Sequence, residues 1–142
     1  MVKRLAVIAI IALFPASVIC ANQTTPKVTI PVSKTTPTSG QQMYSNYCTP
    51  CHGQDGKGQG PVASVLKSQP TDLTILARNN NGKFPATHVT AVLQNGVSIP
   101  AHGTASMPVW GPILGKMDVT NPQDRDLRIS NLSHYLRTMQ EK

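Results

Sequence analysis

The sequence contains one pentad whose residue types and spacing suit a specific chemistry, Cys48-Thr49-Pro50-Cys51-His52. Two cysteine thiols one helical turn apart can add to the two vinyl groups on one side of a porphyrin. The histidine that follows then lies beneath the iron and offers an imidazole nitrogen as a ligand. The pentad therefore predicts one covalently attached haem c, bound through Cys48 and Cys51, with His52 as an iron ligand.

Two other uses of such a cysteine pair are a zinc site and a redox-active dithiol. A structural zinc ion takes four protein ligands, and the sequence has no second cysteine pair to supply the remainder. A thioredoxin-like dithiol belongs to an α/β fold, and no segment shows the alternation of a strand. The histidine directly after the second cysteine favours haem attachment.

An electron-carrying haem c needs a sixth ligand on the other face of the iron. Outside the N-terminal segment the candidates are methionines and histidines: Met43, Met107, Met117, Met139, His88, His102 and His134. We favour Met107, because it lies in a Gly/Pro-rich loop 55 residues after His52, which is enough chain to wrap a porphyrin. Pro108 stiffens the backbone beside it. His102 and Met117 remain alternative ligands, and a loop-core role for Met107 remains open.

Trp110 follows the favoured ligand by three residues and is the single tryptophan of the chain. An indole ring can pack on haem and donate its N–H to a propionate. We therefore expect Trp110 to contact the cofactor.

The N-terminal segment carries export signals rather than fold signals. Lys3 and Arg4 precede an uncharged apolar run, residues 5–19, which is typical of a signal peptide and short for a membrane span. We expect residues 1–21 to be a cleaved signal; an uncleaved anchor or a lipid on Cys20 are the alternatives. The Thr/Pro-rich residues 22–39 then form a tether, and the folded domain spans 40–142.

Charge and helix signals describe the rest of the chain. Removing Lys3 and Arg4 with the signal lowers the formal net charge from +7 to +5.

Helices are expected from Ser39 to Cys48, over 62–67, over 71–78, from Pro85 to Asn95 and from Asn121 onward, where capping residues and prolines punctuate the sequence. The last has an apolar face of Ile129, Leu132, Leu136 and Met139. The fold class is therefore all-α, with four to five short helices wrapped around one haem.

From about Gly40 to Gln140 the chain resembles a class I bacterial c-type cytochrome, a monohaem cytochrome c domain. The matching segments are Tyr47 to Gly53, the Gly-rich run to Gly60-Pro61, the Met107-Pro108 loop and the last helix. The resemblance implies that the first and last helices cross, with Gly40, Met43 and Tyr44 against Leu132, Tyr135 or Leu136. It also implies that Pro61 packs on the haem.

These features predict a single-electron carrier in a periplasmic or otherwise exported chain, and not an enzyme. A haem subunit of a larger dehydrogenase or oxidase, and a five-coordinate gas sensor or peroxidase, are the alternatives. The partners are redox proteins, a dehydrogenase donor and an oxidase or other acceptor, with an acidic docking face that meets lysines such as Lys57, Lys67 and Lys83. Dispersed basic residues argue against nucleic-acid binding. The membrane is a partner only if the N-terminal segment is uncleaved or lipidated.

Overall fold

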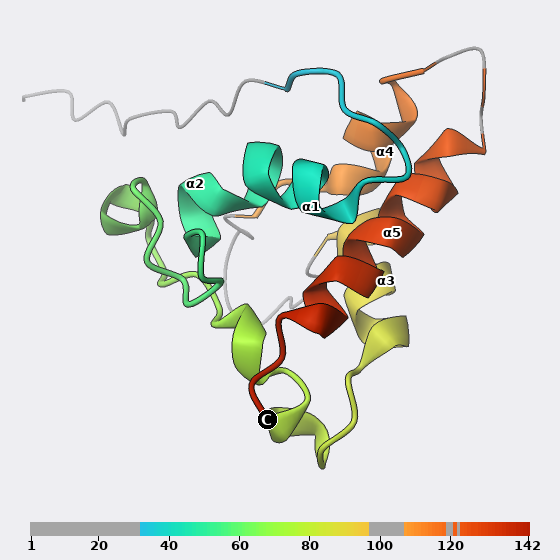
Figure 1. Ribbon diagram of the computed structural model, residues 1–142. Coiled ribbons are helices and arrows are strands. Elements are labelled where there is room, and N and C mark those ends of the chain that lie inside the picture. Colours follow the sequence, from blue (N-terminus) through green and yellow to red (C-terminus); the bar gives the residue numbers. More distant parts are fainter. Residues whose placement is uncertain (1–31, 97–106, 119–120, 122) are drawn as a thin grey trace, which may run out of the picture.

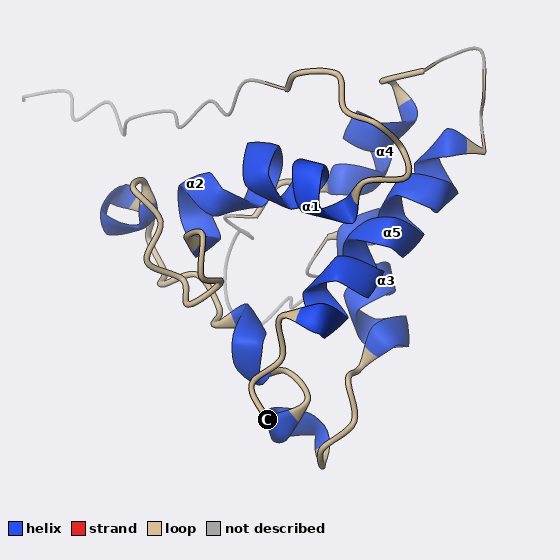
Figure 2. Ribbon diagram, in the orientation of Figure 1, coloured by secondary structure: helices blue, strands red, loops and turns tan. Residues whose placement is uncertain are grey.

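The computed structural model describes residues 32–96, 107–118, 121 and 123–142. Within these ranges the chain is helical and has no strand (Figure 2), which confirms the predicted all-α class. The α-helices are α1 (Gly40–Met43), α2 (Thr49–His52), α3 (Ala86–Asn95), α4 (Trp110–Gly115) and α5 (Asp124–Thr138). Figure 1 shows that α5 lies beside α1, and that α3 and α4 also pack against α5.

The first helix starts at the predicted cap. The Ser39 hydroxyl accepts a hydrogen bond from the Gln42 backbone N–H at 3.1 Å, which satisfies one of the free donors at the helix start. The Gln42 side chain does not return to Ser39, as in a full capping box, but accepts from the Thr36 N–H at 2.8 Å. This bond ties the preceding segment to the helix.

One continuous helical run carries the chain from α1 to His52, with a π-helical turn, Tyr44–Cys48, between α1 and α2. Pro50 explains the irregularity, because it has no N–H to donate to the preceding turn. The Thr49 N–H bonds to the Tyr44 carbonyl, and the Thr49 hydroxyl donates to the Ser45 carbonyl at 2.6 Å. The wider turn therefore still satisfies its backbone and leads directly into the cysteine pair.

The crossing of α1 and α5 is close because Gly40 has no side chain. A Cβ on Gly40 would lie 2.2 Å from the Asn131 carbonyl oxygen and 2.8 Å from the Tyr135 Cβ. Tyr44 packs against Tyr135 with ring centroids 5.4 Å apart. The helix crossing implied by the resemblance is thus confirmed, and it fixes the helical run that ends at His52.

Two of the remaining helices agree with their sequence signals, and one was not predicted. Helix α3 begins one residue after Pro85 and ends at Asn95, with Gly96 as its C-cap. Helix α5 lies in the predicted region but begins at Asp124 with Gln123 as its N-cap, not directly after Asn121; the Asn121 side-chain amide donates instead to the Asp124 carboxylate at 2.9 Å. Helix α4 lies where a loop was expected; Pro112 stands in its first turn, where a missing N–H is harmless.

The expected helices over 62–67 and 71–78 are not present as regular α-helices. The structure has short 3-10 turns instead, Ala63–Val65, Leu73–Ile75 and Arg78–Asn80. The Asp72 carboxylate accepts from both the backbone N–H and the hydroxyl of Thr74, which favours a capped turn over a longer helix. The predicted stop is correct, since Asn81 adopts a left-handed conformation at φ 53°.

Part of the expected tether packs on the domain. Thr35 is 4% exposed, and its hydroxyl oxygen accepts from the Arg128 Nη1 at 2.9 Å and bonds to the Tyr47 hydroxyl at 2.8 Å. The packed region therefore starts before the expected boundary at residue 40, because buried groups of the helices take their partners from it.

The signal segment 1–21 and residues 22–31 lie outside the described residues. None of the helices in the described part of the chain combines the length and apolar character needed to traverse a lipid bilayer.

Candidate functional site

The candidate site is built on the helical turn that joins the two cysteines. Cys48 ends the π-helical turn and is 7% exposed, whereas Cys51 lies in α2 and is partly exposed. Both thiols are free, so the two cysteines do not form a disulfide. One face of a single turn thus offers two thiols for covalent bonds.

The His52 ring is held in one orientation by the backbone. Its Nδ1 lies 2.9 Å from the Thr71 carbonyl oxygen, an acceptor, so Nδ1 carries the proton and donates. The lone pair then resides on Nε2, the nitrogen available to a metal. Burial lowers the pKa of His52, against a smaller opposite effect of the Thr71 hydrogen bond. The imidazole is therefore neutral at pH 7, which is the form that ligates iron.

A tight loop after His52 keeps this turn in place. The Gly58 N–H donates to the His52 carbonyl at 2.8 Å, and the Gly60 N–H donates to the Cys51 carbonyl at 3.0 Å. A Cβ on Gly60 would lie 2.4 Å from the Pro50 carbonyl oxygen, so only glycine permits this approach. Pro61 follows on the exposed side of the loop, and its contact with haem stays a prediction.

Both cysteine side chains are neutral thiols at pH 7, because burial raises their pKa values. Burial, with a contribution from Cys51, raises the pKa of Cys48 to about 12, and burial also raises the pKa of Cys51. Zinc binding requires thiolates and further ligands. Among the described residues no three His, Cys, Asp or Glu side chains come together as such a set. Two free thiols on one turn beside a neutral imidazole fit a covalently bound haem c.

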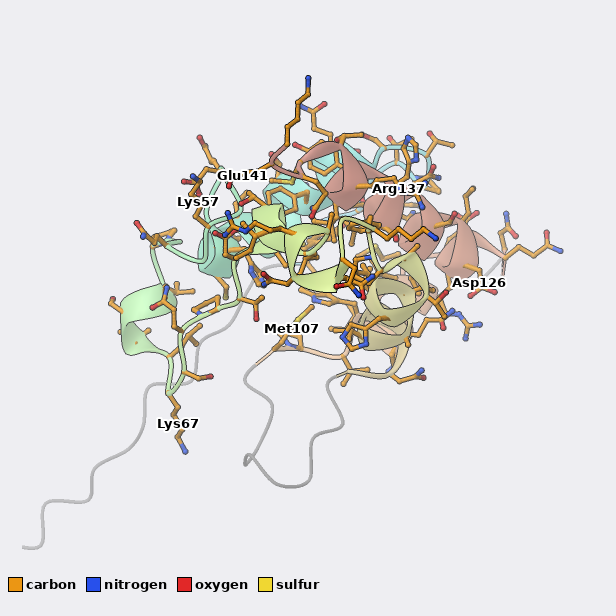
Figure 3. All side chains as sticks on the ribbon, turned by 90° about the horizontal axis from the view of Figure 1, so that it is seen from below. Lys57, Lys67, Met107, Asp126, Arg137 and Glu141 are labelled. Atoms are coloured by element: carbon orange, nitrogen blue, oxygen red, sulfur yellow. The ribbon has the colours of Figure 1, made fainter. Side chains whose placement is uncertain are left out.

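The Met107 loop returns to the attachment helix through an aromatic contact. Trp110 is 3% exposed and stacks on Tyr47, the residue before Cys48, with centroids 5.5 Å apart and an interplanar angle of 27°. Met107 is partly buried and packs against the core (Figure 3). The stack therefore holds Trp110, three residues after Met107, against the residue that precedes Cys48, while iron ligation by Met107 and haem contact by Trp110 stay predictions.

The other ligand candidates have different surroundings. The Met117 Sδ lies 3.5 Å from the Tyr47 hydroxyl, and Met43 is fully buried in the core. His88 and His134 are exposed on α3 and α5. Met139 packs at the edge of the core, and His102 lies outside the described residues. Among the candidates that the structure describes, Met117 is the one whose sulfur lies against a polar group of the attachment helix, the Tyr47 hydroxyl.

A buried polar cluster beside the site was not foreseen from the sequence. Arg128 is 1% exposed; besides Thr35, its guanidinium faces the Asp124 carboxylate at 4.0 Å, and its Nε has no hydrogen-bond partner. The Tyr47 hydroxyl joins this cluster and also donates to the Ser33 carbonyl. An arginine in an amphipathic helix is normally exposed to solvent, so the periodicity of the sequence does not predict the burial of Arg128.

A separate hollow of about 510 Å³ lies between α3 and α5. It is lined by Asp126, His134, Arg137 and mostly small or polar neighbours, and it includes none of the predicted haem residues. It does not contribute to the candidate site.

Comparison with known families agrees with this site. A family model described as cytochrome C oxidase, cbb3-type, subunit III matches residues 35–121, which is more than half of the chain and contains the cysteine pair, His52 and Met107. Among curated proteins, none matches the sequence significantly. The domain is thus a small all-α cytochrome c fold with one covalent haem c as its cofactor, and haem-based electron transfer with redox partners is its general role. The chain belongs to this family of monohaem c-type cytochrome domains.

Proposed function

We propose that this protein is a single-electron carrier of an exported electron-transfer chain. Cys48 and Cys51 hold the haem, His52 binds one face of the iron and Met107 the other. The observation that carries the proposal is the bond between His52 Nδ1 and the Thr71 carbonyl, which presents Nε2 as a fixed, neutral ligand. The Tyr47–Trp110 stack supports Met107 as the second ligand, because it holds Trp110, three residues after Met107, against the helical run that carries the cysteines.

The ligand set favours electron transfer over catalysis. If His52 and Met107 both bound the iron, no coordination position would remain for a substrate. A methionine opposite a histidine raises the reduction potential relative to two histidines. The haem held by Cys48, Cys51, His52 and Met107 would supply one-electron redox chemistry without binding a substrate.

The chain organisation follows from the same proposal. Residues 1–21 direct export, residues 22–39 link the signal to the domain, and residues 40–142 bind the haem. The packed Thr35 supports a linker whose last part belongs structurally to the domain. Export places Cys48 and Cys51 where haem c is found in bacteria, outside the cytoplasmic membrane.

A haem subunit of a larger complex is a second candidate. The family description, an oxidase subunit, favours it. Affinity purification from the native membrane distinguishes the two: a carrier is recovered alone at moderate salt, whereas a subunit is recovered with stoichiometric partner chains.

The ligand assignment is tested by spectroscopy of the holoprotein. Ferric iron bound by a methionine sulfur gives a weak near-infrared charge-transfer band, which Met107→Ala should abolish while lowering the reduction potential. Met117→Ala is the matched control and should keep the band, since Met117 lies against Tyr47. Loss of the band in the control alone would transfer the ligand role to Met117. A wild-type protein without the band that binds carbon monoxide rapidly would instead support a sensor or peroxidase.

A further inference from the structure

A shallow groove of about 390 Å³ lies between residues 32–34 and the end of α4. We call it the lysine groove; its lining residues are Val32, Lys34, Ile113, Lys116 and Met117. Three of these five residues are apolar, and Val32 is 46% exposed. Both lysines are exposed and no acidic residue is among the described residues that line the groove, so it combines apolar side chains with two positive charges.

The charges of this groove have no ion-pair partner among the described residues. In the described part of the chain neither Lys34 nor Lys116 forms an ion pair. Lys57 differs, because its ammonium lies 3.0 Å from the Glu141 carboxylate, and hydrogen bonding to Glu141 raises its pKa (Figure 3). Arg78 also lies within 3.9 Å of Glu141. An approaching acidic surface therefore meets uncompensated positive charge at the lysine groove rather than at Lys57.

The groove is also connected to the haem attachment site. Met117 lines it, and the Met117 Sδ lies 3.5 Å from the Tyr47 hydroxyl. Tyr47 is bonded through the backbone to Cys48 and stacks on Trp110. Electron transfer weakens steeply with distance, and a partner seated on Met117 would be joined to Cys48 by a short route, the Met117 and Tyr47 side chains and the peptide between Tyr47 and Cys48.

We propose that the lysine groove is the docking surface for a redox protein that presents an apolar side chain ringed by acidic residues. This inference rests on the proposed electron-carrier function and names the face that the carrier uses. Lys34 and Lys116 steer the acidic ring, and Ile113 and Met117 receive the apolar side chain. Lys67, which Figure 3 shows at the tip of a loop, and Lys83 belong to other surfaces and are the rival docking residues.

The first experiment measures local charge at the point of electron exit. The ferrous holoprotein passes one electron to hexacyanoferrate(III), giving the ferric protein and hexacyanoferrate(II), and the rate is followed by stopped flow at low ionic strength. Lys34→Glu and Lys116→Glu should each slow this reaction roughly three- to tenfold and accelerate oxidation by the cationic tris(phenanthroline)cobalt(III). Lys67→Glu and Lys83→Glu change the net charge by the same amount. They should change both rates by less than about twofold, because a distant charge is screened by the salt.

The second experiment tests docking of a protein. Flavodoxin, an acidic redox protein, is titrated into the holoprotein while backbone amide chemical shifts are recorded. Shifts centred on Val32, Lys34, Ile113, Lys116 and Met117 support the proposal, and Lys34→Glu should remove them while the haem spectrum stays unchanged.

Two results overturn the proposal in different ways. Equal or larger rate effects in Lys67→Glu and Lys83→Glu, or amide shifts centred on those residues, would reject the lysine groove and leave the carrier function intact. A ferrous wild-type protein that passes no electron to either metal complex would reject the carrier function itself and the groove with it.

Discussion

Replacing Gly40 by alanine tests whether the α1–α5 crossing stabilises the fold. The added Cβ would lie 2.2 Å from the Asn131 carbonyl oxygen and 2.8 Å from the carbonyl carbon. Real Cβ contacts essentially never fall under 3.0 Å, so the two helices must separate by about 0.8 Å or tilt. The obstacles are backbone atoms of α5, which cannot rotate away as the end of a long side chain can.

The size of the effect follows from two opposing contributions. Overpacking of a tight contact costs about 1–3 kcal/mol, and a backbone obstacle places Gly40→Ala in the upper part of this range. Alanine gains at most about 1 kcal/mol in helix propensity, and only part of it at the first helical position. The holoprotein should therefore lose about 1–2 kcal/mol, which corresponds to a fall in Tm of roughly 5–15 °C for a domain of this size.

The assay is guanidinium unfolding of the holoprotein followed by far-ultraviolet circular dichroism, with the slope m compared between variants. Gly115→Ala, in α4, is the matched control, because its Cβ would meet the Arg125 side chain at an ordinary 3.5 Å. The control should match the wild type or exceed it slightly. An unchanged midpoint for Gly40→Ala would show that the crossing can relax freely and that close packing of α1 on α5 does not determine stability.

Further predictions concern the haem, the N-terminal segment and a buried phenol. Haem should resist acid–acetone extraction from the wild type, and Cys48→Ala or Cys51→Ala should sharply reduce holoprotein yield; haem that extracts cleanly from the wild type argues against covalent attachment by these residues. Thr35→Val should lower the free energy of unfolding by about 1–3 kcal/mol in the same assay, because a buried guanidinium N–H of Arg128 loses its acceptor. The control Thr36→Val changes an exposed side chain and should leave the free energy of unfolding unchanged. Equal losses in the two variants would contradict the packing of Thr35 on the domain. Burial raises the pKa of Tyr44 above 10.0, so at high pH the folded state keeps a proton that the unfolded chain releases. The contribution of the protonated phenol to the free energy of unfolding is complete below about pH 10 and is lost as the pH rises further. Tyr44→Phe should therefore show a shallower loss of stability above about pH 10 than the wild type, and parallel curves would refute the linkage.

The sequence predicted the cofactor and the helices whose signals are local. The cysteine pair with its histidine specifies haem attachment because the reacting groups lie within one helical turn. Helices α3 and α5 were predicted because capping residues, a glycine stop and an apolar period all act over a few residues. The crossing at Gly40 followed from a family pattern, and the structure confirms it through the contact with Asn131.

Tertiary structure decided the features that depend on distant partners. No local signal shows that the Thr35 hydroxyl hydrogen-bonds with Tyr47 and with Arg128, 93 residues away, so the sequence predicts a free linker there. Helix α4 is short and rich in glycine and proline, and packing against α3 and α5 stabilises it rather than intrinsic propensity. The tautomer of His52 likewise depends on the Thr71 carbonyl. Sequence patterns report the backbone preferences of neighbours, whereas buried polar groups must find partners wherever the folded chain supplies them.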